Sequence, residues 1–446
     1  MGHFNLLHPS RRGFMAGTAA LGAASALGVT PSYAAVNWRK FAGTTIEVNL
    51  IKSPRGDTLM KHQAEFEALT GIKVNAEQTP EQQQRQKAVI ELSSGRPSFD
   101  VVHISFHVQK RQFEKGGWLA DLTPFIKDPE LSDPSMTSND FAAAGMEFAT
   151  NKKTGHIGAL PLSVDYWIIY WNKELFAAKG LQFPKTFQEM VETAEALTDP
   201  ATNTYGFVAR GMKNANTPVY TSLLLGWGKS SIDDAGHLTT DSPEGIEAAA
   251  LYKRLMTKSA PRGVTGFNWM ECQSAFLQGK IGMWFDGVGF APPLEDPNKS
   301  RVVGKVGYGA VPAGPKAHAA PTTGDGIGVT SASTKQGAAY LYCQWATSKI
   351  MGARLLQTGS GVPFRNSVLM DPEVRKSVTM PSAWVDAVAE SAKISELCLP
   401  VIIPVTEFRD TIGVGLTNLI GGADPATEMK RATAEFRPVL ERSEAG

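Results

Sequence analysis

Cysteine is scarce in this chain, with three residues, Cys272, Cys343 and Cys398, among 446. Their odd number and wide spacing exclude the disulfide framework of a small exported domain. We expect buried free thiols, although the sequence leaves open whether one pair is bridged. None of them lies directly after the N-terminal segment described below, so no cysteine is available there as the acceptor of a lipid anchor.

An excess of charge of either sign is also lacking, because 44 lysines and arginines oppose 43 aspartates and glutamates. A balanced charge creates no field that would concentrate nucleic acid or anionic lipid, so we expect no nucleic-acid partner. Beyond residue 34 there is no long apolar span, no charged tail and no repeat of 20–50 residues. A chain of this length with 42% hydrophobic residues usually folds into two domains.

Motifs of known catalytic sites are missing as well. The chain has no clustered cysteines, no His-Glu-x-x-His, no nucleophile elbow and no phosphate loop. His103 and His107 are four residues apart, but they straddle a strand end without an intervening glutamate, so we expect neither a metal nor a cofactor. A pair of carboxylates that cleaves glycosides is recognised by the distance between the two groups in the folded protein, which the sequence does not reveal. An exported enzyme acting on carbohydrate therefore remains an alternative.

What the N-terminus does contain is a complete export signal. Arg11, Arg12 and Phe14 precede a weakly apolar run over residues 16–29, and small residues at 32–34 form a cleavage site. The run is too short and too rich in alanine and glycine to span a bilayer. Paired arginines in this setting resemble a twin-arginine signal. We therefore expect residues 1–34 to be cleaved and the product, 412 residues with a net charge of −1, to be free in the periplasm.

Alternating strands and helices follow the signal. Their order is typical of a sheet flanked by helices with right-handed crossovers, in which ligands gather beyond the carboxyl ends of the strands. We therefore expect loops at 53–57 and 103–107 to share one rim. The expected elements are a strand at 45–51, a helix ended by Gly71, a strand at 72–76, a helix at 82–94 and a strand at 99–104.

A second unit begins near residue 157. The composition of residues 305–330 turns rich in glycine, proline and alanine, which favours a crossing between domains. Thr186 and Glu189 form a capping box at the start of one helix. The unit opens with residues 157–161 and 167–173. The expected strand is 281–285, and the expected helices are 187–197, 244–256, 272–277, 336–347, 350–356 and 426–440.

Four stretches, taken together, carry a family resemblance. In order they are Phe-Asp-Val-Val at 99–102 with Gly-Trp-Leu-Ala-Asp-Leu at 117–122, Gly-Ala-Leu-Pro-Leu at 158–162 with Trp-Asn-Lys-Glu-Leu-Phe at 171–176, Ala-Phe-Leu-Gln-Gly-Lys-Ile-Gly-Met at 275–283, and Gly-Ser-Gly-Val-Pro-Phe-Arg at 359–365. Their shared order and spacing resemble the extracellular solute-binding proteins of ABC importers, the group that includes maltose-binding protein.

This resemblance implies an α/β, two-lobed periplasmic binding protein fold of type II, in which two α/β lobes are joined by hinge crossovers. It places residues 35–157 and 308–362 in the N-terminal lobe and residues 158–307 and 363–446 in the C-terminal lobe. It implies a monomer that closes on a small carbohydrate or polyol, catalyses no reaction and docks on the transmembrane subunits of an ABC permease.

The rim and the resemblance together give a set of candidate ligand contacts. Hydroxyl-rich ligands need carboxylates, amides and guanidinium groups for hydrogen bonds, and aromatic planes for their carbon faces. The alternative for these residues is a purely structural role, and for Arg365 a tie between the lobes is an equal alternative. The candidates are Ser53, Arg55, His103, Ser105, Asp165, Tyr166, Trp227, Trp284, Asp286, Gly287, Gly324, Asp325, Arg365, Glu407 and Arg409.

The charge of the ligand follows from the basic residues in this set. An anionic ligand, such as glycerol phosphate, should require several basic side chains, and only Arg55, Arg365 and Arg409 are candidates. We therefore predict a neutral ligand, with an anionic one as the alternative. Residues 286–289, Asp-Gly-Val-Gly, lack the aromatic that many sugar binders carry there, which argues against a long oligosaccharide.

Overall fold

A computed structural model describes residues 36–136 and 139–444. The predicted signal at 1–34 lies outside the described residues. All three cysteines are buried and free, which confirms the expectation of isolated thiols. No helix in the described part of the chain is long and apolar enough to cross a membrane.

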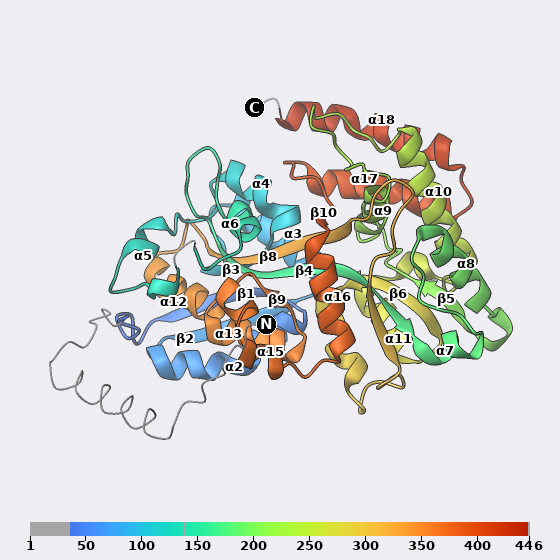
Figure 1. The fold of residues 1–446 in the computed structure, drawn as a ribbon. Coiled ribbons are helices and arrows are strands. Elements are labelled where there is room, and N and C mark those ends of the chain that lie inside the picture. Colours follow the sequence, from blue (N-terminus) through green and yellow to red (C-terminus); the bar gives the residue numbers. More distant parts are fainter. Residues whose placement is uncertain (1–35, 137–138, 445–446) are drawn as a thin grey trace, which may run out of the picture.

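The first lobe is built on three parallel strands, with β1 between β2 and β3. The predicted order of strands and helices is confirmed, and Gly71 ends α2 in the left-handed region at φ 71°. The lobe occupies the left of Figure 1, where blue and teal helices flank these strands. Its opening elements are β1 (Thr45–Ile51), α2 (Pro54–Thr70), β2 (Lys73–Thr79), α3 (Glu81–Ser93), β3 (Val101–Ser105), α4 (Phe106–Gly116), α5 (Thr123–Lys127) and α6 (Ala143–Ala149).

The second lobe contains β5 and β6, which pair in parallel, and it lies at the right of Figure 1. Thr186 accepts a hydrogen bond from the backbone of Glu189, which confirms it as the cap of α8, whereas the Glu189 carboxylate accepts from Lys185 N. The elements are α7 (Lys173–Ala178), α8 (Phe187–Leu197), β5 (Tyr205–Val208), α9 (Thr217–Leu225), α10 (Pro243–Lys258), α11 (Trp269–Leu277), β6 (Ile281–Gly287) and β7 (Val306–Ala310).

Two long strands join the lobes. The stretches at 157–161 and 167–173, which open the second unit of the sequence, both contribute to one continuous strand, β4 (Leu160–Asn172). Its first half pairs with β8 (Ala320–Val329), and its second half pairs with β6 and β7. Since β8 also pairs with β3, a single hydrogen-bonded path runs through both lobes, in the order β2-β1-β3-β8-β4-β6-β5. Figure 1 shows β4 and β8 crossing the middle of the molecule side by side.

The C-terminal third returns to both lobes. Helices α14 and α15 contact α13, whereas α17 and α18 contact α9 and α10 of the second lobe. The remaining elements are α12 (Gln336–Ala346), α13 (Lys349–Thr358), β9 (Val362–Pro363), α14 (Asn366–Leu369), α15 (Pro372–Lys376), α16 (Ser382–Lys393), β10 (Ser395–Leu397), α17 (Val405–Ile420) and α18 (Pro425–Glu444).

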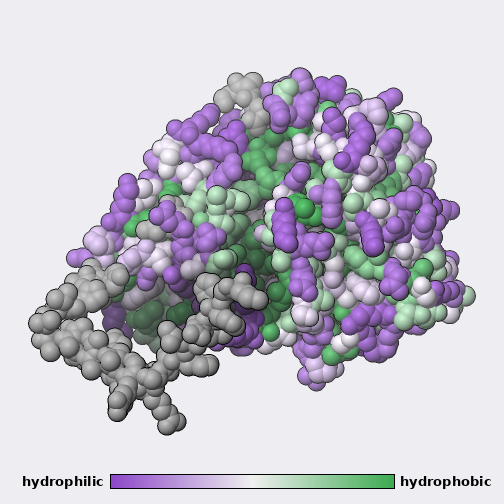
Figure 2. Space-filling view, in the orientation of Figure 1, coloured by the Kyte–Doolittle hydropathy of each residue, from purple (hydrophilic) through white to green (hydrophobic). Residues whose placement is uncertain are grey.

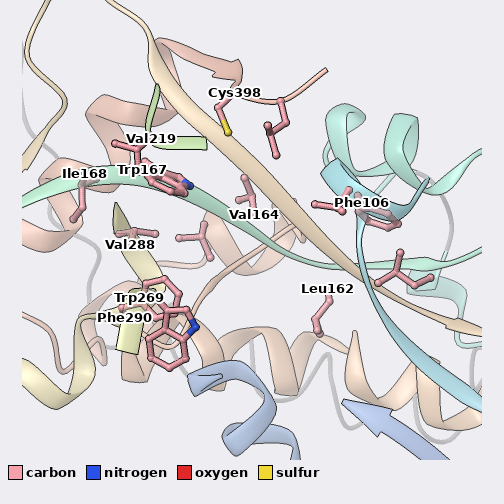
Figure 3. Packing of buried hydrophobic residues seen from close by; sticks show 14 of the residues in the cluster. Phe106, Leu162, Val164, Trp167, Ile168, Val219, Trp269, Val288, Phe290 and Cys398 are labelled. Carbon is pink, nitrogen blue, oxygen red and sulfur yellow. The ribbon is translucent and has the colours of Figure 1, made fainter. Parts of the chain in front are cut away.

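The apolar core is continuous across the junction of the lobes. β3, β6 and β8 are buried along their whole length, as expected for strands covered on both faces. Figure 2 shows apolar side chains gathered along the boundary between the left and right parts, with hydrophilic ones on the outer flanks. Figure 3 shows aromatic core residues such as Trp167, Trp269 and Phe290 close to this junction.

Candidate functional site

A cavity of about 40 Å³ lies where the lobes meet the two crossing strands. Charged side chains from both lobes converge on it, which is the usual character of a small-molecule site. Its lining consists of Ile51, Ser53, Arg55, Glu81, Arg85, Ser105 and His107 from the first lobe, Asp165, Trp167, Thr323 and Asp325 from the crossing strands, and Arg210, Pro218, Trp269, Phe290 and Arg409 from the second lobe.

Arg55 ties the first lobe to both crossing strands. The segment predicted as a loop is instead the first turn of α2, since Ser53 is its N-cap and accepts a hydrogen bond from Gly56 N at 3.2 Å. This turn aims Arg55 at β4 and β8. Its Nη2 donates to Asp165 Oδ2 at 2.7 Å, and its Nη1 donates to Asp325 Oδ2 at 2.9 Å. Two carboxylates that are 160 positions apart in sequence are thereby held on one guanidinium.

The position of Asp165 depends on a neighbouring glycine. A Cβ atom at Gly287 would lie 2.6 Å from Asp165 Oδ2, so a side chain there would displace the carboxylate. The other oxygen, Oδ1, accepts from Gly289 N at 3.1 Å. Gly287 was expected to let a ligand approach the backbone, but the group that approaches it is Asp165.

The first turn of α3 supplies a second pair of charges. Arg85 Nη2 lies 2.6 Å from Glu81 Oε1 and donates to Ser105 Oγ at 2.8 Å. Burial opposes the charged carboxylate, but Arg85 and Arg210 lower the pKa of Glu81 to about 2. β3 continues through Ser105 and α4 starts at Phe106, so the expected loop at 103–107 is absent.

Arg210 is the counterpart of this pair in the second lobe. Its Nε donates to both carboxylate oxygens of Asp286, at 3.0 and 3.1 Å, and its Nη1 lies 3.6 Å from Glu81 Oε2. The guanidinium also stacks 4.9 Å from the ring centre of Trp167. Because Glu81 belongs to the first lobe, this ion pair bridges the cavity from one lobe to the other.

Aromatic planes complete the second-lobe side. Trp269 and Phe290 stack with ring centres 4.6 Å apart and planes 13° from parallel, and Figure 3 shows the two rings overlapping. Trp269 begins α11, where Glu271 accepts a hydrogen bond from Asn268 N in a capping box. These rings can contact the carbon face of a ligand whose hydroxyl groups reach the charged residues.

Two histidines of the first lobe contact β8, at Gly324 and Asp325. His107 lines the cavity, and its Nδ1 lies 3.2 Å from Gly324 O. His103 is fully buried behind the cavity, with Nε2 3.4 Å from Asp325 Oδ2. Burial, together with the nearby charge of Arg85, lowers the pKa of His107 to about 3. His107 is therefore neutral in the folded protein at neutral and mildly acidic pH.

This shifted pKa predicts a pH dependence of stability. In the unfolded chain His107 takes up a proton below about pH 6.5, whereas the folded protein binds that proton only near pH 3, so stability falls as the pH drops through this interval. Between pH 6.5 and 4.5 the loss should be about 2 kcal/mol. Urea unfolding at these two pH values should show a smaller loss in His107→Asn. An equal loss in both proteins would assign the pH dependence to other groups.

Several predicted residues lie away from the cavity. Trp284 is fully buried and stacks on Tyr170 at 4.6 Å, and Trp227 donates from Nε1 to Glu247 at 2.7 Å. Tyr166 points to the opposite face of β4 from Asp165, because side chains alternate along a strand. Glu407 is exposed on α17. In the structure these four residues therefore occupy packing, hydrogen-bonding or surface positions and do not line the cavity.

Three more expected residues support the structure around the site. Asp286 is fully buried and holds Arg210 in place, and Gly324 accepts the contact from His107 with its carbonyl. Arg365 lies within the first lobe, where it donates to Asp140 Oδ2 at 2.9 Å and stacks on Phe141. Arg365 thus neither lines the cavity nor links the two lobes.

The residues that do line the cavity include Ser53, Arg55, Ser105, Asp165, Asp325 and Arg409 from the predicted set. Sequence reasoning did not select Glu81, Arg85, Arg210, Trp269 or Phe290. The rim rule could have found Glu81 and Arg85, because α3 begins just beyond the carboxyl end of β2. No motif marks the other three.

Comparison with known proteins identifies the family. Residues 52–352 match the model of the bacterial extracellular solute-binding proteins. A probable amino-acid ABC transporter periplasmic-binding protein of Sinorhizobium fredii is 28% identical, over 82% of this chain and 84% of the relative. An erythritol/L-threitol-binding protein of Mycolicibacterium smegmatis is 24% identical, over 88% and 85%. A solute-binding protein structure from Agrobacterium radiobacter in complex with ribitol has a TM-score of 0.81 and 25% identity, covering 89% of this chain and 99% of that one.

Proposed function

This chain belongs to the bacterial extracellular solute-binding protein family, and from that premise we propose that it binds a small polyhydroxylated compound between its lobes and delivers it to an ABC permease. The predicted role as the substrate-binding component of an importer is thereby retained. No reaction is part of the proposal, and the protein acts as a monomer.

The observation that carries this proposal is the composition of the interlobe cavity. Arginines and carboxylates from both lobes offer donors and acceptors at fixed positions, and the stacked rings of Trp269 and Phe290 offer an apolar plane. A hydroxylated carbon chain needs these two kinds of contact. The small cavity volume of about 40 Å³ argues against an oligosaccharide, and two relatives, one named for erythritol and L-threitol and one solved with ribitol, bind short polyols.

Closure of the lobes is the proposed binding movement. The ion pair between Glu81 and Arg210 spans the cavity, so the arrangement of charges that a ligand meets is complete only when the lobes are together. The predicted lobe boundaries, 35–157 with 308–362 and 158–307 with 363–446, remain part of this proposal, except that Arg365 and helices α14 and α15 pack on the first lobe. The proposal also includes export by the twin-arginine route, cleavage of the signal after Ala34 and delivery of the ligand to the permease from the periplasm.

A ligand screen on the mature protein tests the function. Residues 35–446 should be heated with erythritol, threitol, ribitol, mannitol and their oxidised acids. We expect at least one of these compounds to raise the melting temperature in a concentration-dependent manner, because a ligand at 100 times its Kd stabilises by about 2.7 kcal/mol. Small-angle scattering should show compaction with the same compound.

Two outcomes would contradict the proposed function. The first is the absence of stabilisation by every polyol and every polyol-derived acid in the screen. The second is chemical conversion of the bound compound, which nuclear magnetic resonance of the recovered ligand would detect. Conversion would favour the alternative of an exported enzyme acting on carbohydrate.

A further inference from the structure

Four arginines line the cavity, namely Arg55, Arg85, Arg210 and Arg409. Three of them have carboxylate partners within the protein. Arg55 contacts Asp165 and Asp325, Arg85 contacts Glu81, and Arg210 contacts Asp286 and Glu81. All four carboxylates around the cavity are therefore already engaged by these three guanidinium groups.

Arg409 is different. It lies in the first turns of α17 and is 2% exposed, yet within residues 36–136 and 139–444 its side chain has no hydrogen-bond acceptor and no ion pair. Its Nε is buried without a partner. On the facing α3, Nη1 of Arg85 is also buried without a partner. Arg55 Nε is buried without a partner as well, so three guanidinium groups at the cavity each keep one donor that the described residues do not use, but Arg55 and Arg85 have carboxylate partners and Arg409 has none.

The surroundings of Arg409 oppose its charge. Burial, together with the nearby charge of Arg85, lowers its pKa to about 9. The guanidinium still carries its charge at neutral pH. Within the described residues no carboxylate pairs with it directly, and the negative charge of Glu81 acts on it only from a distance. A buried charge without a partner is costly, and a ligand that brings the opposite charge removes that cost.

We propose that the ligand is a polyhydroxylated monocarboxylate, a sugar acid, whose carboxylate binds the guanidinium of Arg409. This inference rests on the proposed function and names the substrate class of the same site. The fork of a guanidinium matches a carboxylate, which can accept two parallel hydrogen bonds.

The rest of the lining limits the ligand to a single negative charge. Glu81, Asp165 and Asp325 also face the cavity, and a dianionic phosphate would be repelled by them. The same three carboxylates can accept hydrogen bonds from hydroxyl groups. The neutral ligand predicted from the sequence assumed three basic candidates, but the structure places Arg365 elsewhere and adds Arg85 and Arg210.

Calorimetric titration with matched pairs tests the inference, using ribonate against ribitol, erythronate against erythritol and mannonate against mannitol. In the mature protein the acid of the best pair should bind at least 100-fold more tightly than its alcohol. Arg409→Gln should weaken binding of the acid at least 100-fold and that of the alcohol less than 3-fold. Without ligand, the variant should melt at the same temperature or higher, because it removes an uncompensated charge.

Two further variants serve as controls. Arg409→Lys keeps the charge but loses the fork, so the acid should retain an intermediate preference, and this variant is the test should Arg409→Gln not fold. Arg431→Gln alters an arginine on α18 that pairs with Glu428 at the surface, and it should leave the ratio of the two affinities unchanged.

The outcomes separate this inference from the proposed function. Equal binding of acid and alcohol, an unchanged ratio in Arg409→Gln, or preference for a phosphate ester would overturn the inference while the polyol function stands. Binding of an amino acid such as serine instead of every hydroxy acid, lost in Arg409→Gln, would support the carboxylate contact and overturn the polyhydroxyl class. Failure of acids, alcohols and amino acids alike would overturn both.

Discussion

Arg55→Met should lower the free energy of unfolding by about 3–5 kcal/mol, because removing one partner of a buried ion pair leaves its counter-charges unpaired. Asp165 is 6% exposed and Asp325 is 9% exposed, and both lose the same guanidinium. Equilibrium unfolding in urea at pH 7 measures this loss. Ligand binding should be lost with it, because the first lobe is no longer tied to the crossing strands.

The pH dependence gives this prediction a second readout. Burial already raises the pKa of Asp165, and loss of Arg55 should raise it further, so protonation of Asp165 at acidic pH should make the stability loss of the variant relative to the wild type smaller. Arg254→Met is a matched control, since Arg254 pairs with Glu195 at the surface and should contribute less than 1 kcal/mol. A loss as small as that of the control, or one that is the same at every pH, would contradict the proposed pairing.

Arg210→Met should have a stability effect of similar size, about 3–5 kcal/mol, for a different reason. Asp286 is fully buried, and besides Arg210 its carboxylate accepts a hydrogen bond only from Gly287 N within the described residues. The substitution also removes the ion pair with Glu81 that joins the lobes. We therefore expect weaker ligand binding in addition to the loss in unfolding free energy.

Glu81→Gln separates these two consequences. It breaks the contact between the lobes but leaves the pair of Arg210 and Asp286 intact. Its unfolding free energy should fall by less than that of Arg210→Met, while the compaction on ligand binding seen by scattering should diminish in both. Equal stability losses in the two variants would show that Asp286 does not depend on Arg210.

Sequence reasoning located the first-lobe elements because each carries a local signal. β1 alternates in polarity, and Gly71 ends α2 in a conformation that favours glycine. The rim rule then placed Ser53, Arg55 and Ser105 correctly at the cavity. These predictions required no knowledge of distant contacts.

The candidates on β6 were harder to place. β6 is buried on both faces, so its sequence has no polar alternation that would show which side chains face the cavity. Trp284 and Asp286 share one face and both point into the core of the second lobe. Arg210 was missed because its role depends on two contacts that are distant in sequence. It pairs with Asp286, which is 76 positions away, and with Glu81 across the cavity, which is 129 positions away.

The continuity of β4 limits how the molecule can be divided. A fragment that contained only one lobe would leave the backbone N–H and C=O groups of the crossing strands without their hydrogen-bond partners. Such unpaired strand edges favour aggregation with other chains. Neither half should therefore be obtainable as a well-behaved fragment.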